Sequence, residues 1–338
     1  MNLTPILNQA VDRPLSEGEA HEAALVLMSG EASPAQVGGL LMALRVRGET
    51  GAEILGFARA LRERATAFPL LAEGLIDTCG TGGDGLATLN VSTLAGIAAA
   101  AAGARVAKHG NRAVSSRCGS ADLLEALGVR IDGSPATTAR CIEVTGFGFL
   151  FAPHYHQTLR HLAPIRRELG FRTIFNLVGP LANPALVRRQ VLGVPTPAHL
   201  RPMAEALHSL GAEHALVVHG SDGSDEITLC GPTAAIEVKP EGLEERTLHP
   251  EDVGLPVCPP CALKGGDAAA NAEIASRVLN GERGAAHDAV VLNAAAALMV
   301  SGQAPNLREG AERARDALLS GRARSVLHRL GEMSREPA

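Results

Sequence analysis

The sequence predicts an α/β protein in which a small all-helical domain precedes a larger α/β domain with a mostly parallel central sheet. Residues 1–68 contain only helix signals, whereas short apolar runs alternate with helical segments after Pro69. The 46% hydrophobic content suffices for a sizeable core, and the 20% charged content is too low for a disordered chain. We therefore place the helical domain at residues 1–68 and the α/β domain at 69–338.

The helical domain is predicted from three start signals. Each is a capping box, in which a serine or threonine is followed three residues later by Glu or Gln, and they begin at Ser16, Ser33 and Thr50. Apolar residues follow Ser33 and Thr50 at the spacing of a helix. Three short helices with one apolar stripe each need one another, or a partner, to bury those stripes.

The α/β domain is predicted from five apolar runs of strand length. Strand–helix alternation indicates a parallel sheet with right-handed crossovers, and helix start signals lie between the runs at Ser120 and Ser134-Pro135. Ligands of such sheets bind where the strands end, so the loops after the runs are the candidate sites. The predicted strands are Leu75–Cys79, Ala104–Lys108, Phe147–Ala152, Gln190–Val194 and Ala215–His219.

Composition argues against several functional classes. The 31 Lys and Arg residues against 36 Asp and Glu give a net charge of −5, which argues against nucleic acid as a partner. The chain has no Trp and a single Tyr, which disfavours a stacking surface for single strands. The N-terminus lacks the features of a signal peptide, and the longest apolar runs are too short to span a bilayer. We expect a soluble cytoplasmic protein that binds no membrane.

The cysteines give no clear metal or redox site. Cys258 and Cys261 have the CxxC spacing, but no second CxxC and no histidine cluster follows them. Both inner residues are prolines, which disfavours a redox pair. We expect two unlinked thiols on a proline-rich surface loop.

The loop after the first predicted strand has the composition of a phosphate-binding loop. Between Gly80 and Gly85 four of six residues are glycines, which let the backbone approach a ligand and expose its N–H groups. The spacing also satisfies GxGxxG, but the second strand ends in Lys108-His109 rather than in the acidic residue of a dinucleotide fold. Asp84 would repel a bare pyrophosphate unless a metal or sugar hydroxyls receive it.

Two further segments are candidates for binding an anion. Residues 90–93, Asn-Val-Ser-Thr, open a helix, where a hydroxyl serves either as the N-cap or as a phosphate or Mg²⁺ contact. Residues 108–117 combine cations with hydroxyl and amide groups, and their place at a strand end favours anion binding over a solvated loop. The carboxylates of Asp225 and Glu226 follow another strand and suit Mg²⁺ held with phosphates, although such pairs are often only solvated.

These motifs together resemble the anthranilate phosphoribosyltransferase family. The resemblance covers the chain essentially end to end and includes the segments 119–128 and 166–184. It implies transfer of phosphoribosyl from phosphoribosyl pyrophosphate to anthranilate with Mg²⁺ as cofactor, the second step of tryptophan biosynthesis from chorismate. The motifs that carry it are GTGGDG at 80–85, NVST at 90–93, KHGNRAVSS at 108–116 and Asp225-Glu226.

The resemblance also implies roles for individual residues. Anthranilate would contact Gly80, Asn111 and Arg166, and the metal would be held by Ser92, Asp225 and Glu226. By the same similarity the protein would be a homodimer through its helical domain, on which helices from roughly 160–187 would pack. Phosphoribosyl pyrophosphate would be bound by Gly80, Gly83, Asp84, Thr88, Asn90, Val91, Ser92, Thr93, Lys108, His109, Gly110, Asn111, Arg112, Ala113, Val114, Ser115, Ser116 and Ser120.

One segment departs from the family pattern. The family has a His-Pro pair after the third strand, whereas this chain has His156-Gln157. That segment faces the anthranilate entry path in the family, so the departure concerns the choice of acceptor rather than phosphoribosyl binding.

The residues indicate the type of chemistry independently of the resemblance. Pyrophosphate leaves readily once its charge is neutralised, and the arylamine is a neutral nucleophile, so catalysis should depend on positioning and electrostatic stabilisation. His109 is a candidate acceptor of the amine proton, or equally a hydrogen-bonded loop residue. Two alternatives stay open: a transferase or phosphorylase of the same fold with another acceptor, and a non-catalytic nucleic-acid-binding relative. Net charge disfavours the second of these, and Asn111 with Arg166 favours a carboxylate-bearing acceptor over the first.

Overall fold

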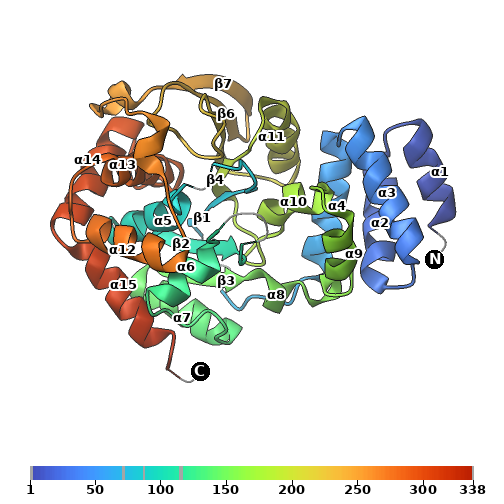
Figure 1. The fold of residues 1–338 in the computed structure, drawn as a ribbon, viewed down its shortest axis with the longest axis horizontal. Helices are drawn as coiled ribbons and strands as arrows, with labels where there is room; N and C mark the ends of the chain where they lie inside the picture. The colour runs from blue at the N-terminus through green and yellow to red at the C-terminus, as the bar shows by residue number, and fades with distance from the viewer. Residues whose placement is uncertain (1–2, 71–72, 87, 114–116, 337–338) are drawn as a thin grey trace.

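Helices form one end of the molecule, and a sheet covered by further helices forms the rest (Figure 1). The computed structural model describes residues 3–70, 73–86, 88–113 and 117–336. The first four helices lie at one end and the C-terminal helices at the other, with the sheet between them. The helical end contains α1 (Thr4–Asp12), α2 (Glu17–Ser29), α3 (Pro34–Arg47) and α4 (Gly51–Arg64).

All three predicted capping boxes are confirmed. The side chains of Ser16, Ser33 and Thr50 each accept a hydrogen bond from the backbone amide of the residue three positions on. The side chain of that residue in turn accepts one from the backbone amide of the serine or threonine. Helix α1 was not predicted, because its N-cap is Leu3 and no side chain caps it. The signal available was Pro5 in its first turn, a position that proline favours.

Helices from the middle of the chain complete the helical end. Helix α9 (Leu162–Leu169) contacts α3, and α10 (Ile174–Val178) contacts α4. The Phe57 and Phe175 rings meet edge to face with their centroids 5.6 Å apart. Burial of these apolar stripes therefore depends on residues more than a hundred positions apart in the sequence.

Across the described residues, seven strands form one sheet in the order β3-β2-β1-β4-β5-β6-β7. The predicted strands are confirmed as β1 to β5, and all pairings among them are parallel. The carboxyl ends of β1, β2, β4 and β5 consequently meet at one edge. The strands are β1 (Leu75–Gly80), β2 (Arg105–Gly110), β3 (Phe147–Phe151), β4 (Arg189–Gly193), β5 (His214–Gly220), β6 (Thr233–Lys239) and β7 (Gly242–Leu248).

The antiparallel hairpin of β6 and β7 was not predicted. Strand β7 lies at the edge of the sheet and carries the exposed charged residues Glu244, Glu245 and Arg246. Charged side chains protect an edge strand from pairing with other chains, and they also remove the apolar run by which a strand is recognised. The hairpin makes the sheet mixed at one end.

Helices cover both faces of the sheet. Alternate residues along each strand enter different cores: Leu216 and Val218 pack with α5 and α13, whereas Ala215 and Val217 pack with α11. Helix α7 covers β2 and β3 on the α11 side through Ala139 and Ile142. The helices of this part are α5 (Val91–Ala101), α6 (Ser120–Ala126), α7 (Pro135–Thr145), α8 (Ala152–Tyr155), α11 (Leu200–Ser209), α12 (Ala268–Leu279), α13 (Ala285–Val300), α14 (Leu307–Leu319) and α15 (Arg322–Met333).

Of the helix starts predicted at Ser134 and Ser120, the first is confirmed and the second is shifted by a residue. Ser134 caps α7 as predicted, through a bond from the Thr137 amide. Ser120 is not the N-cap of α6, because Gly119 holds that position and its amide donates to Asp122 Oδ2 at 2.8 Å. The 3₁₀ helices are Gln157–Leu159, Gly179–Ala182, Pro197–His199, Pro250–Val253 and Pro260–Leu263.

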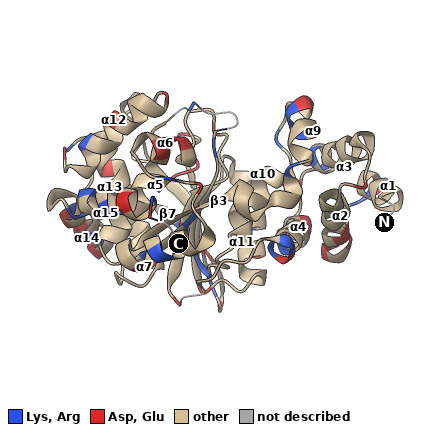
Figure 2. Ribbon diagram, turned by 90° about the horizontal axis from the view of Figure 1, so that it is seen from below, with Lys and Arg blue, Asp and Glu red and all other residues tan. Residues whose placement is uncertain are grey.

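The surface carries charges of both signs. Figure 2 shows basic and acidic residues beside one another on outer helices such as α4 and α14.

Cys258 and Cys261 are free thiols on the connection before α12. Within the described residues, no helix has both the length and the apolar character needed to cross a membrane.

Candidate functional site

The glycine loop leaves β1 at the edge where the parallel strands end. Gly82, Gly83 and Gly85 have φ angles of 67°, 77° and 75°, a region that residues with a Cβ rarely adopt. Gly80 permits a close approach, because a Cβ there would overlap the carboxylate of Asp225. Glycine at these positions therefore lets a loop from another strand pack directly on the end of β1.

The paired carboxylates lie against this loop. The Gly82 amide donates to Asp225 Oδ2 at 2.7 Å, and the Ser92 amide donates to Glu226 Oε1 at 3.0 Å. The structure thus brings together Ser92, Asp225 and Glu226, the three predicted metal ligands. Burial raises the pKa of both carboxyls, and repulsion from Asp84 at Asp225 and from Asp225 at Glu226 raises them further.

A buried lysine stands behind the carboxylates. The Lys108 side chain is 2% exposed and donates from Nζ to the Thr78 carbonyl and, at 3.3 Å, to Ser92 Oγ. Its charge favours the ionised forms of Glu226 and of the fully buried Asp77. Burial nevertheless raises the pKa of Asp77 to about 6. Lys108 is therefore a counter-charge inside the protein rather than an exposed cation.

The helix α5 begins in the same place. Asn90 holds the N-cap position but makes no side-chain cap bond, and neither Ser92 nor Thr93 is the cap. Asn90 instead donates to the Cys118 carbonyl at 3.0 Å and accepts from Asn271 Nδ2 at 3.0 Å. The amides of the first turn already have acceptors: Val91 donates to the Leu89 carbonyl at 2.8 Å, Ser92 to Glu226 Oε1 at 3.0 Å and Thr93 to the Asn90 carbonyl at 3.1 Å.

The loop after β2 is only partly directed toward this edge. The Arg112 guanidinium pairs with Asp122 and Glu125 on α6, so the structure does not bring it to Asp225 and Glu226. Asn111 and Ser120 lie together, since Ser120 Oγ donates to the Asn111 carbonyl at 3.4 Å. Val114, Ser115 and Ser116 lie outside the described residues. The other predicted residues of this part are Gly110 at the end of β2, Ala113 in the loop, Val91 in the first turn of α5, and Thr88 paired with Lys264.

His109 ends β2 with one ring nitrogen bonded and the other without a partner. Nδ1 lies 3.1 Å from the Gly179 carbonyl, and buried Nε2 has no hydrogen-bond partner among the described residues. Burial, reinforced by His156, lowers the pKa of His109 to about 3, so the ring is neutral at pH 7. Since a carbonyl only accepts, Nδ1 carries the proton and Nε2 keeps a free lone pair.

Arg166 comes from the helical end of the molecule. Its guanidinium lies over the Phe175 ring at 5.4 Å and donates from Nη2 to Asn176 Oδ1 at 3.2 Å. Phe175 and Asn176 belong to α10, and Gly179 directly after α10 is the partner of His109. The segment from Phe175 to Gly179 therefore links Arg166, the residue predicted to bind anthranilate, to His109 at the end of β2.

The donors beside β1 fit a magnesium ion. Carboxylate and hydroxyl oxygens are the ligands that Mg²⁺ prefers, and the ion usually takes one or two carboxylates together with substrate phosphates. Among the residues that the structure describes, no group of three or more His, Cys, Asp or Glu is placed to hold a metal alone. Asp225, Glu226 and Ser92 therefore fit a metal that a phosphorylated ligand helps to bind.

Sequence reasoning missed two residues of this edge. Arg172 donates from Nη2 to the Thr81 carbonyl at 3.0 Å and from Nη1 to the Gly82 carbonyl. Asn271, besides bonding Asn90, accepts from the Gly266 amide at 2.7 Å. Both come from segments far from the glycine loop in sequence, and neither has a local pattern that would reveal its position.

Comparison with known proteins identifies the family. The model of the glycosyl transferase family a/b domain matches residues 72–324, and that of the family's helical bundle domain matches residues 4–65. The anthranilate phosphoribosyltransferase of Rubrobacter xylanophilus is 55% identical over 97% of this chain and 96% of its own length. That of Thermomicrobium roseum is 54% identical over 94% of this chain and 92% of its own.

Solved structures agree in both fold and sequence. The anthranilate phosphoribosyltransferase of Thermus thermophilus superposes with a TM-score of 0.92 at 50% identity, covering 98% of this chain and 99% of its own. The Saccharomyces cerevisiae enzyme in complex with PRPP and Mg gives 0.90 at 28% identity, covering 98% and 97%. The chain therefore belongs to the anthranilate phosphoribosyltransferase family.

Proposed function

We propose that this protein transfers the phosphoribosyl group of phosphoribosyl pyrophosphate (PRPP) to anthranilate, giving N-(5-phosphoribosyl)anthranilate and pyrophosphate, the second step of tryptophan biosynthesis from chorismate. The observation that carries the proposal is the meeting of a glycine loop, a helix N-terminus and two buried carboxylates at one edge of the sheet. Relatives with this activity in their names match nearly the whole chain. The S. cerevisiae enzyme has been solved with PRPP and Mg and with 4-fluoroanthranilate.

On this proposal PRPP binds along the ends of β1 and β2, through those residues assigned to it from the sequence that lie at this edge. Arg112, which pairs with Asp122 and Glu125, and Lys108, whose charge faces the protein interior, do not contact it directly in this arrangement. The backbone of the glycine loop supplies N–H groups for phosphate oxygens, and the N-terminus of α5 supplies the positive end of the helix dipole. Ser92, Asp225 and Glu226 would hold Mg²⁺, which when bound would neutralise charge on the pyrophosphate. Asn111 and Arg166 would hold the anthranilate carboxylate, and the boundary between the two substrates lies at Gly80.

The residues of the chain mainly position the reactants. Attack by the amine on the sugar carbon displaces pyrophosphate, and an arylamine needs no strong base to attack. The arylammonium that forms is a strong acid, so a neutral imidazole suffices to take its proton. We assign that role to Nε2 of His109, whose lone pair no other group uses within the described structure.

Rates should show no titration of His109 near pH 6.5, the ordinary pKa of imidazole, because burial lowers the pKa of this ring to about 3. The profile of kcat/KM for anthranilate against pH measures this. His109→Asn, which keeps a polar side chain but loses Nε2, should lower kcat and leave the KM for PRPP nearly unchanged. An inflection near pH 6.5 that disappears in this variant would contradict the neutral ring.

Arg166→Ala should raise the KM for anthranilate by at least ~10-fold, because a guanidinium binds a carboxylate through two charge-assisted hydrogen bonds. The KM for PRPP should change much less. Steady-state kinetics in both substrates measures the difference, and Arg167→Ala, the exposed neighbour on α9, is the matched control. Equal changes in both KM values would overturn the assignment of Arg166.

Gly83→Ala should weaken PRPP binding by at least ~10-fold while the protein still folds. The new Cβ would impose a left-handed backbone cost of about 1–2 kcal/mol and would overlap Nη1 of Arg172. Gly85→Ala is the control, since Gly85 has a similar φ but open space beside it. Calorimetric titration with PRPP and Mg²⁺ compares the two, and an unchanged affinity in Gly83→Ala would remove the loop from the binding site.

A panel of acceptors tests the proposed function. Release of pyrophosphate from PRPP is measured with anthranilate, with other aminobenzoates and with free nucleobases. We expect release with anthranilate that depends on Mg²⁺, and none with the nucleobases. Release with a nucleobase alone would replace anthranilate by another acceptor on the same fold.

The proposal also covers the oligomeric state, the cellular location and the domain division. We expect a homodimer through the helical end, a cytoplasmic location, and a division into a helical domain of residues 1–68 with segments of 160–187 and an α/β domain of residues 69–338. At the helical end, Val11 on α1 and Val46 on α3 are apolar side chains that are 67% and 79% exposed.

A further inference from the structure

Arg172 connects the helical end of the molecule to the glycine loop. It lies between α9 and α10, and its guanidinium donates to the carbonyls of Thr81 and Gly82. A Cβ on Gly83 would overlap Nη1, so the guanidinium rests directly on the backbone at the tip of the loop. We propose that Arg172 is a positioning residue that holds the glycine loop in the conformation that binds the pyrophosphate of PRPP, an inference that rests on the proposed function.

The loop is held from two opposite sides. Asp225 accepts the Gly82 amide, while Arg172 binds the carbonyls on either side of that amide. The peptide orientations at the tip are thereby fixed, although glycine itself leaves them free. Without Arg172 the start of the loop would keep the bonds from its amides, that of Gly82 to Asp225 and that of Thr81 to the Gly193 carbonyl, but the Thr81 and Gly82 carbonyls would lose the guanidinium that orients them.

The same segment reaches the acceptor side. Asn176 Oδ1 accepts from Arg166 Nη2 at 3.2 Å and from the amide of Thr173 at 3.0 Å. Thr173 is 2% exposed and follows Arg172 directly. The arginine assigned to anthranilate and the arginine on the PRPP loop therefore share one short, hydrogen-bonded stretch of chain.

The charges around Arg172 suit this position. The Asp225 and Asp84 carboxylates favour the charged guanidinium, although burial, the larger effect, lowers the pKa of Arg172. Arg45 and Glu49 from the helical end also act on this charge, with opposite signs. The guanidinium therefore lies between the acidic residues of the proposed metal site and the charged residues of the helical end. From this position it can bind the glycine loop while it is attracted by the carboxylates of Asp225 and Asp84.

The test compares Arg172→Ala and Arg172→Lys with Arg188→Ala. Arg188 also donates to a loop carbonyl, that of Gly211 at 2.8 Å, but before β4, at the opposite edge of the sheet. In Arg172→Ala the KM and the calorimetric Kd for PRPP should rise at least ~10-fold, with kcat changed less and with a melting temperature close to that of Arg188→Ala. Arg172→Lys, which keeps the charge, should lie between wild type and Arg172→Ala, and it carries the comparison if Arg172→Ala does not fold.

A double-mutant cycle with Gly83→Ala makes the test specific. Because the Cβ of residue 83 and Nη1 of Arg172 compete for one place, the two changes should be strongly non-additive in the Kd for PRPP. An unchanged PRPP affinity in Arg172→Ala, or additive effects, would overturn the inference. A wild-type protein that binds no PRPP and releases no pyrophosphate with anthranilate would instead overturn the proposed function.

Discussion

Turnover should fall by at least ~100-fold when Asp225 is replaced by Asn and Glu226 by Gln together, because losing the charge stabilisation of a metal costs several kcal/mol. The two carboxylates are brought to the end of β1 and the first turn of α5 by the loop after β5. The dependence of the rate on Mg²⁺ should weaken or shift to higher concentration. Initial rates over a Mg²⁺ titration measure both effects.

Stability should be nearly unaffected by this double change. The carboxamide oxygens introduced at the two positions would still accept the amides of Gly82 and Ser92, and burial already disfavours the charged carboxylates. Replacing Glu244 and Glu245 by Gln is the matched control, since these adjacent carboxylates are exposed on the edge strand β7. Wild-type turnover with an unaltered Mg²⁺ titration in the double variant of Asp225 and Glu226 would contradict the metal assignment.

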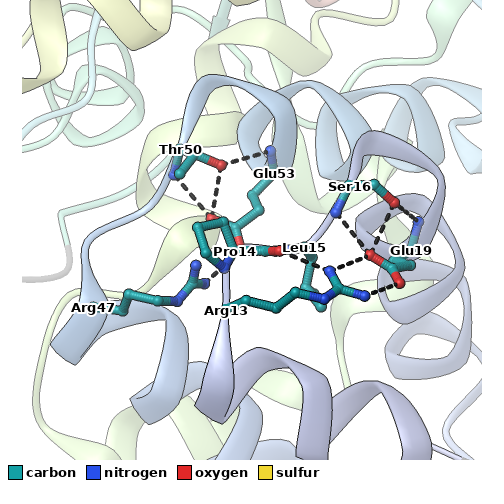
Figure 3. A network of polar contacts seen from close by, with 8 residues as sticks. All are labelled: Arg13, Pro14, Leu15, Ser16, Glu19, Arg47, Thr50 and Glu53. Atoms are coloured by element: carbon teal, nitrogen blue, oxygen red, sulfur yellow. Dashed lines mark hydrogen bonds and ion pairs between the residues drawn. The ribbon is translucent and has the colours of Figure 1, made fainter.

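Glu53→Ala should lower the free energy of unfolding by about 3 kcal/mol, because it breaks a buried ion pair and leaves buried donors without an acceptor. The Glu53 side chain is 0% exposed and forms an ion pair with Arg47 at 2.5 Å. It also accepts the amides of Leu15 and Thr50, both at 2.9 Å (Figure 3). Glu53 therefore links three segments of the helical end.

Glu19→Ala is the control for this variant, because it breaks the same capping motif at a partly exposed site. Glu19 completes the box with Ser16 and pairs with Arg13, and its side chain is 25% exposed (Figure 3). The loss expected for such a cap is about 1 kcal/mol. Urea unfolding of both variants measures the difference, and equal losses would show that burial of the Glu53 network contributes little.

The helices and parallel strands were predictable because their signals are local. A capping box satisfies amides within three residues, and a buried parallel strand is a continuous apolar run, so both are legible in short windows. Helix α1 and strand β7 were missed for the converse reason. The first has no capping side chain, and the second carries exposed charges that suit an edge but hide the strand.

The candidate site was predictable as far as strand ends determine it. Parallel strands place their carboxyl ends together, so Gly80, His109 and Asp225 were expected at one edge before any contact was known. Arg172 and Asn271 were not, because their positions depend on how separate helices pack. The burial of Lys108 was also hidden, since only the fold shows that its charge faces the protein interior.

The most direct test is a structure from crystals of the protein soaked with PRPP, Mg²⁺ and 4-fluoroanthranilate. It shows whether the phosphoribosyl donor and the amine acceptor meet where the parallel strands end. We expect density for pyrophosphate against the glycine loop and the first turn of α5, with a metal between it and Asp225 and Glu226. The acceptor carboxylate should lie beside Arg166. Ligand density that leaves the glycine loop and both carboxylates without a contact would contradict the account.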